Sequence, residues 1–260
     1  MYEKLLNIIY TYTFNYKLPD IEFVNEVINI AIDNDNLSSF VNDVSYNYEY
    51  TASYGFISKT LRFNINNIIR CIKKSLNFYS DAYDLKQIRL FEKYVYVCYE
   101  FVYTILHELE HIKQIKLLDT SEENTFETTL IQNNIDMLSI NPDLYKKEHD
   151  LFPIERMAII NSNSKIIEML KLDGDVFFIL NNIYVNRYNS FVTQYYSNGR
   201  FTLLEYVNDT DSNLYYEDLL IDKNNTKKIL KRVKKDISFE DRVLMGLPIT
   251  QKELDELKNK

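Results

Sequence analysis

The chain has 260 residues, of which 46% are hydrophobic, so it can bury a sizeable core as one large domain or two small ones. Its formal net charge of −8 disfavours non-specific binding to nucleic acid. The two cysteines, Cys71 and Cys98, lack metal-type spacing and exclude a disulfide framework, which fits a reducing cytosol.

The first part of the chain predicts two helices followed by strands. Residues 2–14 and 21–32 carry apolar residues at helical spacing and are separated by Pro19, which cannot continue a helix. Residues 44–50 and 57–65 alternate apolar and polar side chains, which is the period of a half-buried strand. These two runs predict a β-hairpin or meander.

A long helix that is buried on several sides is predicted over residues 91–118. This stretch contains no Gly or Pro, and its apolar residues cover most of a helix circumference. Together the elements predict a mainly helical α+β fold with a small antiparallel sheet that precedes the long helix. The other predicted elements are helices at 66–77, at 122–138 with Ser121 as N-cap, and at 153–172, a helix followed by a strand pair within 175–206, and helices at 226–235 and 250–258.

The most informative feature of the sequence is His107-Glu108-Leu109-Glu110-His111, which lies inside the predicted long helix. Residues at positions i and i+4 lie on one face of a helix, so His107 and His111 can bind one Zn²⁺ together. Glu108 then lies beside the metal, where it can act as general base toward a water. The alternative is a pair of core histidines with hydrogen-bond partners, or a solvated polar face. Glu110 is predicted to be neither a metal ligand nor the general base, but a structural or surface residue.

Two histidines do not complete a catalytic zinc site, which usually has three protein ligands and a water. The metzincin extension H-E-x-x-H-x-x-G-x-x-H is absent, because Gln114 and Leu117 occupy its glycine and histidine positions. A glutamate on a later helix is the other common solution, and Glu155, in the first turn of the helix over 153–172, is the best candidate. An acid there also favours the helix N-terminus through the helix dipole, which is the structural alternative. The other candidates are Glu168 on the same helix and Glu122, Glu123 and Glu127 on the preceding one.

His149 is the only other histidine of the chain and precedes Glu155 by six residues. It could bind zinc in place of Glu155, or donate a hydrogen bond to an oxyanion during the reaction. The remaining alternative is an ordinary surface histidine. The sequence therefore predicts Zn²⁺ as cofactor, with His107, His111 and Glu155 as metal ligands and with Glu108 and His149 as catalytic residues.

The segment Thr104-Ile-Leu-His-Glu-Leu-Glu-His111, followed by Pro153-x-Glu155-x-x-Ala158, resembles the gluzincin branch of zinc peptidases, the thermolysin-like class. The chain looks more like the small cytoplasmic peptidases that phages or mobile elements of low-GC bacteria often carry than like a secreted enzyme. The resemblance covers residues 44–170. It implies a zincin-like catalytic region over residues 1–170 and hydrolysis of a peptide or protein substrate, with a mixed helical C-terminal region over residues 171–260. It also implies that a run such as Thr60–Ile65 forms the sheet edge along which an extended peptide pairs.

The sequence predicts a cytoplasmic protein without a membrane partner. The N-terminus lacks a basic n-region and a small-residue cleavage site, and no segment has 18 uninterrupted apolar residues. The basic run between Lys227 and Lys235 has the spacing of a solvated helix face, so a nucleic-acid partner is not expected. Two rival functions stay open. One is a non-enzymatic interaction or regulatory protein with a structural or vestigial zinc site, and the other is a DNA-contacting regulator that uses residues 227–235.

Overall fold

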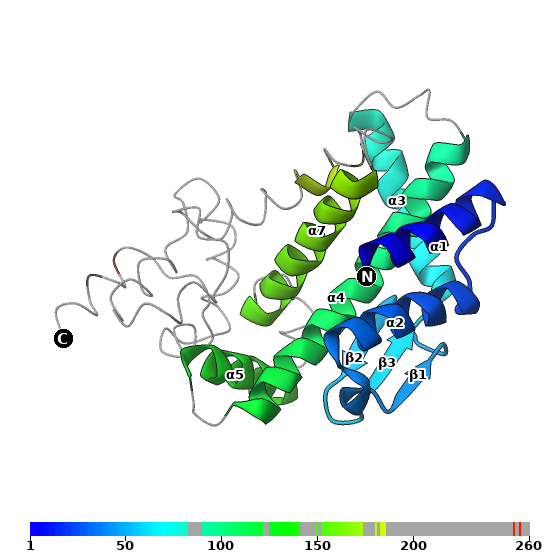
Figure 1. Ribbon diagram of the computed structural model, residues 1–260. Coiled ribbons are helices and arrows are strands. Elements are labelled where there is room, and N and C mark those ends of the chain that lie inside the picture. The colour runs from blue at the N-terminus through cyan, green and yellow to red at the C-terminus, as the bar shows by residue number, and fades with distance from the viewer. Residues whose placement is uncertain are drawn as a thin grey trace. The chain divides into compact units, whose positions relative to one another are not determined.

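The computed structural model describes residues 1–82, 90–121, 125–140, 149, 152–173, 180, 183–185, 252 and 255. These residues form a mainly helical α+β structure with one small sheet, as the sequence predicts at this coarse level (Figure 1). In chain order the elements are α1 (Tyr2–Phe14), α2 (Ile21–Asp35), a short 3₁₀ helix (Ser38–Phe40), β1 (Asp43–Ser45), β2 (Ala52–Gly55), β3 (Thr60–Phe63), α3 (Ile65–Ala82), α4 (Leu90–Thr120), α5 (Phe126–Ile140) and α7 (Pro153–Asp173).

The chain divides into two compact units. The first comprises residues 1–116 and 162–184, and includes α1 to α3, the sheet and most of α4. The second comprises residues 117–161 and 185–260, and includes α5. The predicted strand pair within 175–206 and the basic run of 227–235 lie outside the described residues, and of the helix predicted at 250–258 only two residues are described, both helical. The region boundary predicted after residue 170 stays a prediction.

Capping hydrogen bonds explain where α2 begins and ends. The Asp20 carboxylate accepts a hydrogen bond from the Phe23 N–H at 3.1 Å and caps the first turn. At the other end, Asn36 adopts a left-handed conformation with φ 53°, and its N–H bonds to the Ile32 carbonyl. The helix thus continues to Asp35, past its predicted end at residue 32. The sequence did not reveal this last turn because it is polar and shows no apolar periodicity.

The sheet is mixed, which corrects the prediction of an antiparallel sheet. β2 and β3 form an antiparallel hairpin, whereas β1 pairs with β3 in parallel, so the strand order is β1-β3-β2. The predicted first strand is also shorter than its tyrosine alternation suggests. The side-chain amide of Asn64 donates to the Tyr48 carbonyl at 2.6 Å, and that of Asn67 donates to the Glu49 carbonyl at 2.8 Å. These side chains satisfy the backbone groups that a neighbouring strand would otherwise bind.

The strand order also overturns the expectation that Thr60–Ile65 forms a sheet edge. β3 is the central strand and is hydrogen-bonded on both sides, so its backbone is not open to an added peptide. The edge strands of this sheet are β1 and β2. An alternating pattern reports which face of a strand is buried, but it does not report which neighbours the strand has.

α4 is buried along most of its length, as its sequence predicts. Residues on every side of it are buried, among them Cys98, whose pKa is raised by burial to about 12. The prediction that Ser121 caps the next helix is wrong. α5 begins only at Phe126, where the Thr125 hydroxyl accepts a hydrogen bond from the Thr128 N–H at 3.2 Å, while the Ser121 hydroxyl donates to the Leu117 carbonyl.

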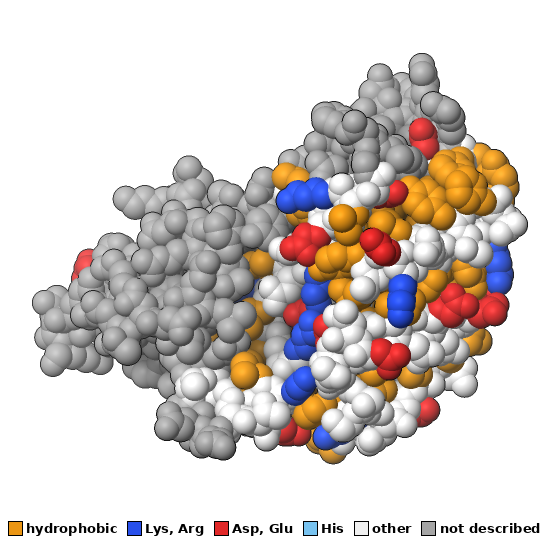
Figure 2. All heavy atoms as spheres, viewed as in Figure 1, with side chains coloured by type: hydrophobic (Ala, Val, Ile, Leu, Met, Phe, Trp, Pro, Cys, Tyr) orange, Lys and Arg blue, Asp and Glu red, His pale blue; other side chains and the backbone are white. Residues whose placement is uncertain are grey.

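Aromatic side chains join the end of α1 to the beginning of α4 at the protein surface. Figure 2 shows hydrophobic side chains gathered over these two helix ends. The rings of Phe14 and Phe91 lie 5.5 Å apart, and those of Tyr16 and Tyr94 lie 5.6 Å apart in an edge-to-face arrangement. Such ring pairs add to the stabilisation from buried area, so they help to hold α1 against α4.

Polar side chains hold the larger part of α7 within the first unit. Two tyrosine hydroxyls, from Tyr10 on α1 and Tyr99 on α4, donate to the Asp173 carboxylate at 2.5 and 2.8 Å. Near the middle of α7, Lys165 forms an ion pair with Glu110 of α4, which is 5% exposed. Because buried charges are tolerated only when paired, these contacts specify how α7 lies against α4.

Asp35, at the end of α2, adds an ion pair with Lys113 of α4 at 2.5 Å. Burial acts to raise the pKa of Asp35, but the hydrogen bonds from Lys113 and Asn34 and the positive charges of Lys113 and Lys165 together outweigh it and hold that pKa below its usual value. A carboxyl group with a lowered pKa in the folded state stabilises the protein above its unfolded-state pKa of about 3.9. This contribution is lost as the pH falls through the folded-state pKa.

Replacing Asp35 by Asn is therefore expected to lower the free energy of unfolding at about pH 7 and to flatten its decline in acid. Urea unfolding at about pH 7 and about pH 2.5 measures both effects, with Asp33→Asn at an exposed position of the same helix as control. A difference between wild type and Asp35→Asn that is the same at both pH values would contradict the ion pair.

Candidate metal centre

α4 presents His107 and His111 on one face, one helical turn apart. Their ring centroids lie 5.0 Å apart and the ring planes are nearly perpendicular, at 88°. His111 is buried, with 4% of its surface exposed, and His107 is half-buried. The two imidazoles are therefore held close together on a helix whose surroundings restrict water.

Glu155 lies in the first turn of α7, which begins at Pro153 as predicted. The carbonyl of Phe152 accepts hydrogen bonds from the N–H groups of Glu155 at 3.1 Å and Arg156 at 3.0 Å, and so starts the helix. The Glu155 side chain is only 2% exposed. A buried carboxylate is unfavourable unless positive or hydrogen-bonding groups surround it, and the Nε2 of His149 is one such group.

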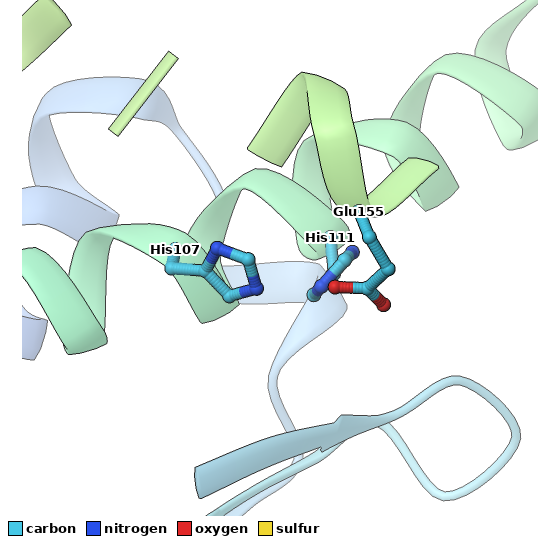
Figure 3. A group of neighbouring side chains, drawn as sticks. All are labelled: His107, His111 and Glu155. Atoms are coloured by element: carbon cyan, nitrogen blue, oxygen red, sulfur yellow. The ribbon is translucent and has the colours of Figure 1, made fainter. Parts of the chain in front are cut away.

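The three predicted ligands form a group that could hold a metal ion (Figure 3). One ligand atom from each of His107, His111 and Glu155 lies within 4.8 Å of the others. Two imidazoles and a carboxylate are also a donor set that zinc accepts, so these residues fit a metal.

His111 has two further neighbours that the sequence pattern did not single out. Its Nδ1 lies 3.0 Å from the Oε1 of Gln114, one turn further along α4. The ring of Phe56, which directly follows β2, stands edge-to-face against the imidazole at 6.1 Å and 83°. Helical spacing alone would have identified Gln114, whereas only the tertiary fold brings Phe56 to His111.

The two other acids of the motif have different surroundings. Glu108 is 6% exposed on α4, next in sequence to His107. Glu110 pairs with Lys165 and also with Lys113, at 3.3 Å, so it is structural and buried within the fold rather than at the surface. Of these two acids, Glu110 thus has a structural role, and Glu108 is the one that directly follows a candidate ligand in the sequence.

His149 lies next to Glu155, whereas Glu168, an alternative ligand, bonds to Tyr2. The Nε2 of His149 lies 3.0 Å from a carboxylate oxygen of Glu155, while the imidazole is 44% exposed. Glu168 accepts a hydrogen bond from the Tyr2 hydroxyl at 2.7 Å, at an exposed position of α7. Glu122 and Glu123 and the side chain of Glu127 lie outside the described residues. The ligand and oxyanion roles considered for His149 stay predictions.

The described residues thus define a mainly helical α+β protein with a His–His–Glu group that could hold a metal ion. No protein-family model, curated protein or solved structure matches the chain. Among the described helices, none combines the length and the apolar character that crossing a membrane requires.

Proposed function

We propose that this protein is a cytoplasmic zinc-dependent peptidase of the gluzincin type, with His107, His111 and Glu155 as zinc ligands. The observation that carries the proposal is the convergence of these three side chains, within 4.8 Å. Glu108, which directly follows His107 in the sequence, is buried as well. A structural zinc site has no need of a carboxylate next to its ligands, whereas hydrolysis needs a general base there.

Each residue of the group has a role in this proposal. His107 and His111 bind through imidazole nitrogens and Glu155 through a carboxylate oxygen. When bound, zinc lowers the pKa of a water toward neutrality and polarises the scissile carbonyl. Glu108 accepts a proton from the attacking water and delivers it to the leaving amine. His149, beside Glu155, is placed to orient that carboxylate through its Nε2.

The substrate in this proposal is a peptide in an extended conformation. β2 is an edge strand, and the residue that follows it, Phe56, contacts the ring of His111. A peptide that pairs with β2 would therefore run toward the candidate metal group, with backbone hydrogen bonds supplying affinity. β2 replaces Thr60–Ile65 in this role, because β3 is the central strand.

Replacing Glu155 by Gln is expected to weaken zinc binding about 10-fold or more and to reduce peptide hydrolysis with it, because a neutral amide is a poorer zinc ligand than a carboxylate. The matched control is Glu168→Gln, the same substitution on the same helix, at a side chain that bonds to Tyr2. Zinc affinity is measured by competition with a chelator of known affinity.

Equal zinc affinity in Glu155→Gln and Glu168→Gln would remove Glu155 from the ligand set. Stoichiometric zinc without cleavage of any peptide in a cytosolic peptide mixture would favour the rival function, an interaction or regulatory protein with a structural site.

A further inference from the structure

We propose that Gln114 is a positioning residue that selects the tautomer of His111 and turns its Nε2 lone pair toward the metal. The proposal rests on the metal site of the proposed function, but not on peptidase activity. Its geometric basis is the 3.0 Å contact between His111 Nδ1 and Gln114 Oε1. Both side chains are buried, with 4% and 6% of their surfaces exposed.

The chemistry of the two groups gives the hydrogen bond a direction. An amide oxygen only accepts hydrogen bonds, so the proton of the contact must belong to Nδ1 of His111. A neutral imidazole carries one proton, and Nε2 is then the nitrogen with the lone pair. A metal ion needs that lone pair, so the hydrogen bond prepares His111 as a ligand before any ion is bound.

The two aromatic neighbours of His111, His107 and Phe56, restrict the plane of its ring but do not distinguish its two nitrogens. His107 and Phe56 both stand nearly perpendicular to the imidazole, with ring centroids at 5.0 and 6.1 Å. A half-turn of the ring about its Cβ–Cγ bond would keep it in the same plane. The contact with Gln114 makes the two orientations unequal, since the turned ring would present a carbon atom to the amide oxygen.

The glutamine is also suited to the charge of the site. Glu108 and Glu155 are already buried, with 6% and 2% of their surfaces exposed. A glutamate at position 114 would add a third buried carboxylate, which is unfavourable in the metal-free protein. The amide accepts the same hydrogen bond without a charge. We therefore expect Gln114→Glu to bind zinc at least as tightly as wild type, because a carboxylate raises the basicity of the ligand, but to be less stable without metal.

Three variants test the proposal. Gln114→Met keeps the length of the side chain and removes the acceptor, Gln114→Glu keeps the acceptor, and Gln132→Met is the same apolar substitution at an exposed position of α5. The nitrogen chemical shifts of the His111 ring, recorded in the metal-free protein at about pH 8, report the tautomer. Chelator competition reports the zinc affinity.

Wild type, Gln114→Glu and Gln132→Met should show the proton on Nδ1. Gln114→Met should lose that preference and bind zinc about 10- to 100-fold more weakly, the range typical of lost partners of metal ligands. Wild-type tautomer and wild-type affinity in Gln114→Met would overturn the proposal. If Gln114→Met does not fold, a proton on Nε2 in wild type or in Gln114→Glu overturns it equally. A protein that behaves as expected here but cleaves no peptide would refute the proposed function and leave the role of Gln114 intact.

Discussion

Replacing Glu108 by Gln is expected to lower the rate of peptide hydrolysis by at least ~10²-fold, the lower end for general acid–base catalysis, while zinc stays bound. The substitution keeps nearly the same shape but removes the group that accepts a proton from the attacking water. Glu108 is next in sequence to one candidate ligand and is buried, so its carboxylate acts where little bulk water can replace it. Rates are compared on a peptide that the wild type demonstrably cleaves.

The matched control for Glu108→Gln is a glutamate on the same buried helix that has a structural partner. Glu100 accepts a hydrogen bond from the Tyr184 hydroxyl at 2.7 Å and lies two turns before His107. Glu100→Gln can keep that hydrogen bond through its amide oxygen and should retain most of the activity. Hydrolysis at the wild-type rate in Glu108→Gln would refute the mechanism, and loss of zinc in that variant would show that Glu108 also supports the metal.

Replacing His111 by Ala is expected to reduce bound zinc from about one ion per chain to almost none. Catalytic zinc sites use three protein ligands, and the substitution leaves one imidazole and one carboxylate. Elemental analysis of the purified protein measures the stoichiometry. The comparison variant is His149→Ala, which removes a neighbour of Glu155 but none of the three candidate ligands, so it should weaken zinc binding without abolishing it.

Thermal unfolding gives a second measurement of the same site. An ion that binds the folded chain stabilises it by RT ln(1 + [L]/Kd), about 2.7 kcal/mol at 100 times the Kd. Zinc should therefore raise the Tm of the wild type and of His149→Ala, but not that of His111→Ala. Unchanged zinc content in His111→Ala would refute the proposed site. Complete loss of zinc in His149→Ala would instead make His149 the third ligand.

Several parts of the fold could be predicted because they depend on local chemistry. α1 and α7 begin at the residues that their sequences indicate, and α4 is buried around its circumference as its apolar residues predict. Helical periodicity and proline positions act within a few residues, so they can be recognised from the sequence alone. The errors concern partners that lie elsewhere in the fold. Asn64 and Asn67 end the first strand early by binding backbone carbonyls, and no alternating pattern reveals such a competitor.

The candidate site likewise combines residues that the sequence identifies with residues that only the tertiary structure brings together. His107, Glu108 and His111 follow from the sequence alone, because helix geometry places residues one turn apart on the same face whatever the rest of the chain does. Glu155 could be named as one of several glutamates, but only the tertiary structure brings its carboxylate to the two imidazoles. The sheet order, which makes β2 an edge strand, and the contact of Phe56 with His111 are likewise decided by tertiary packing. Long-range pairing depends on which surfaces can be buried together, and that choice depends on the whole chain rather than on any one segment.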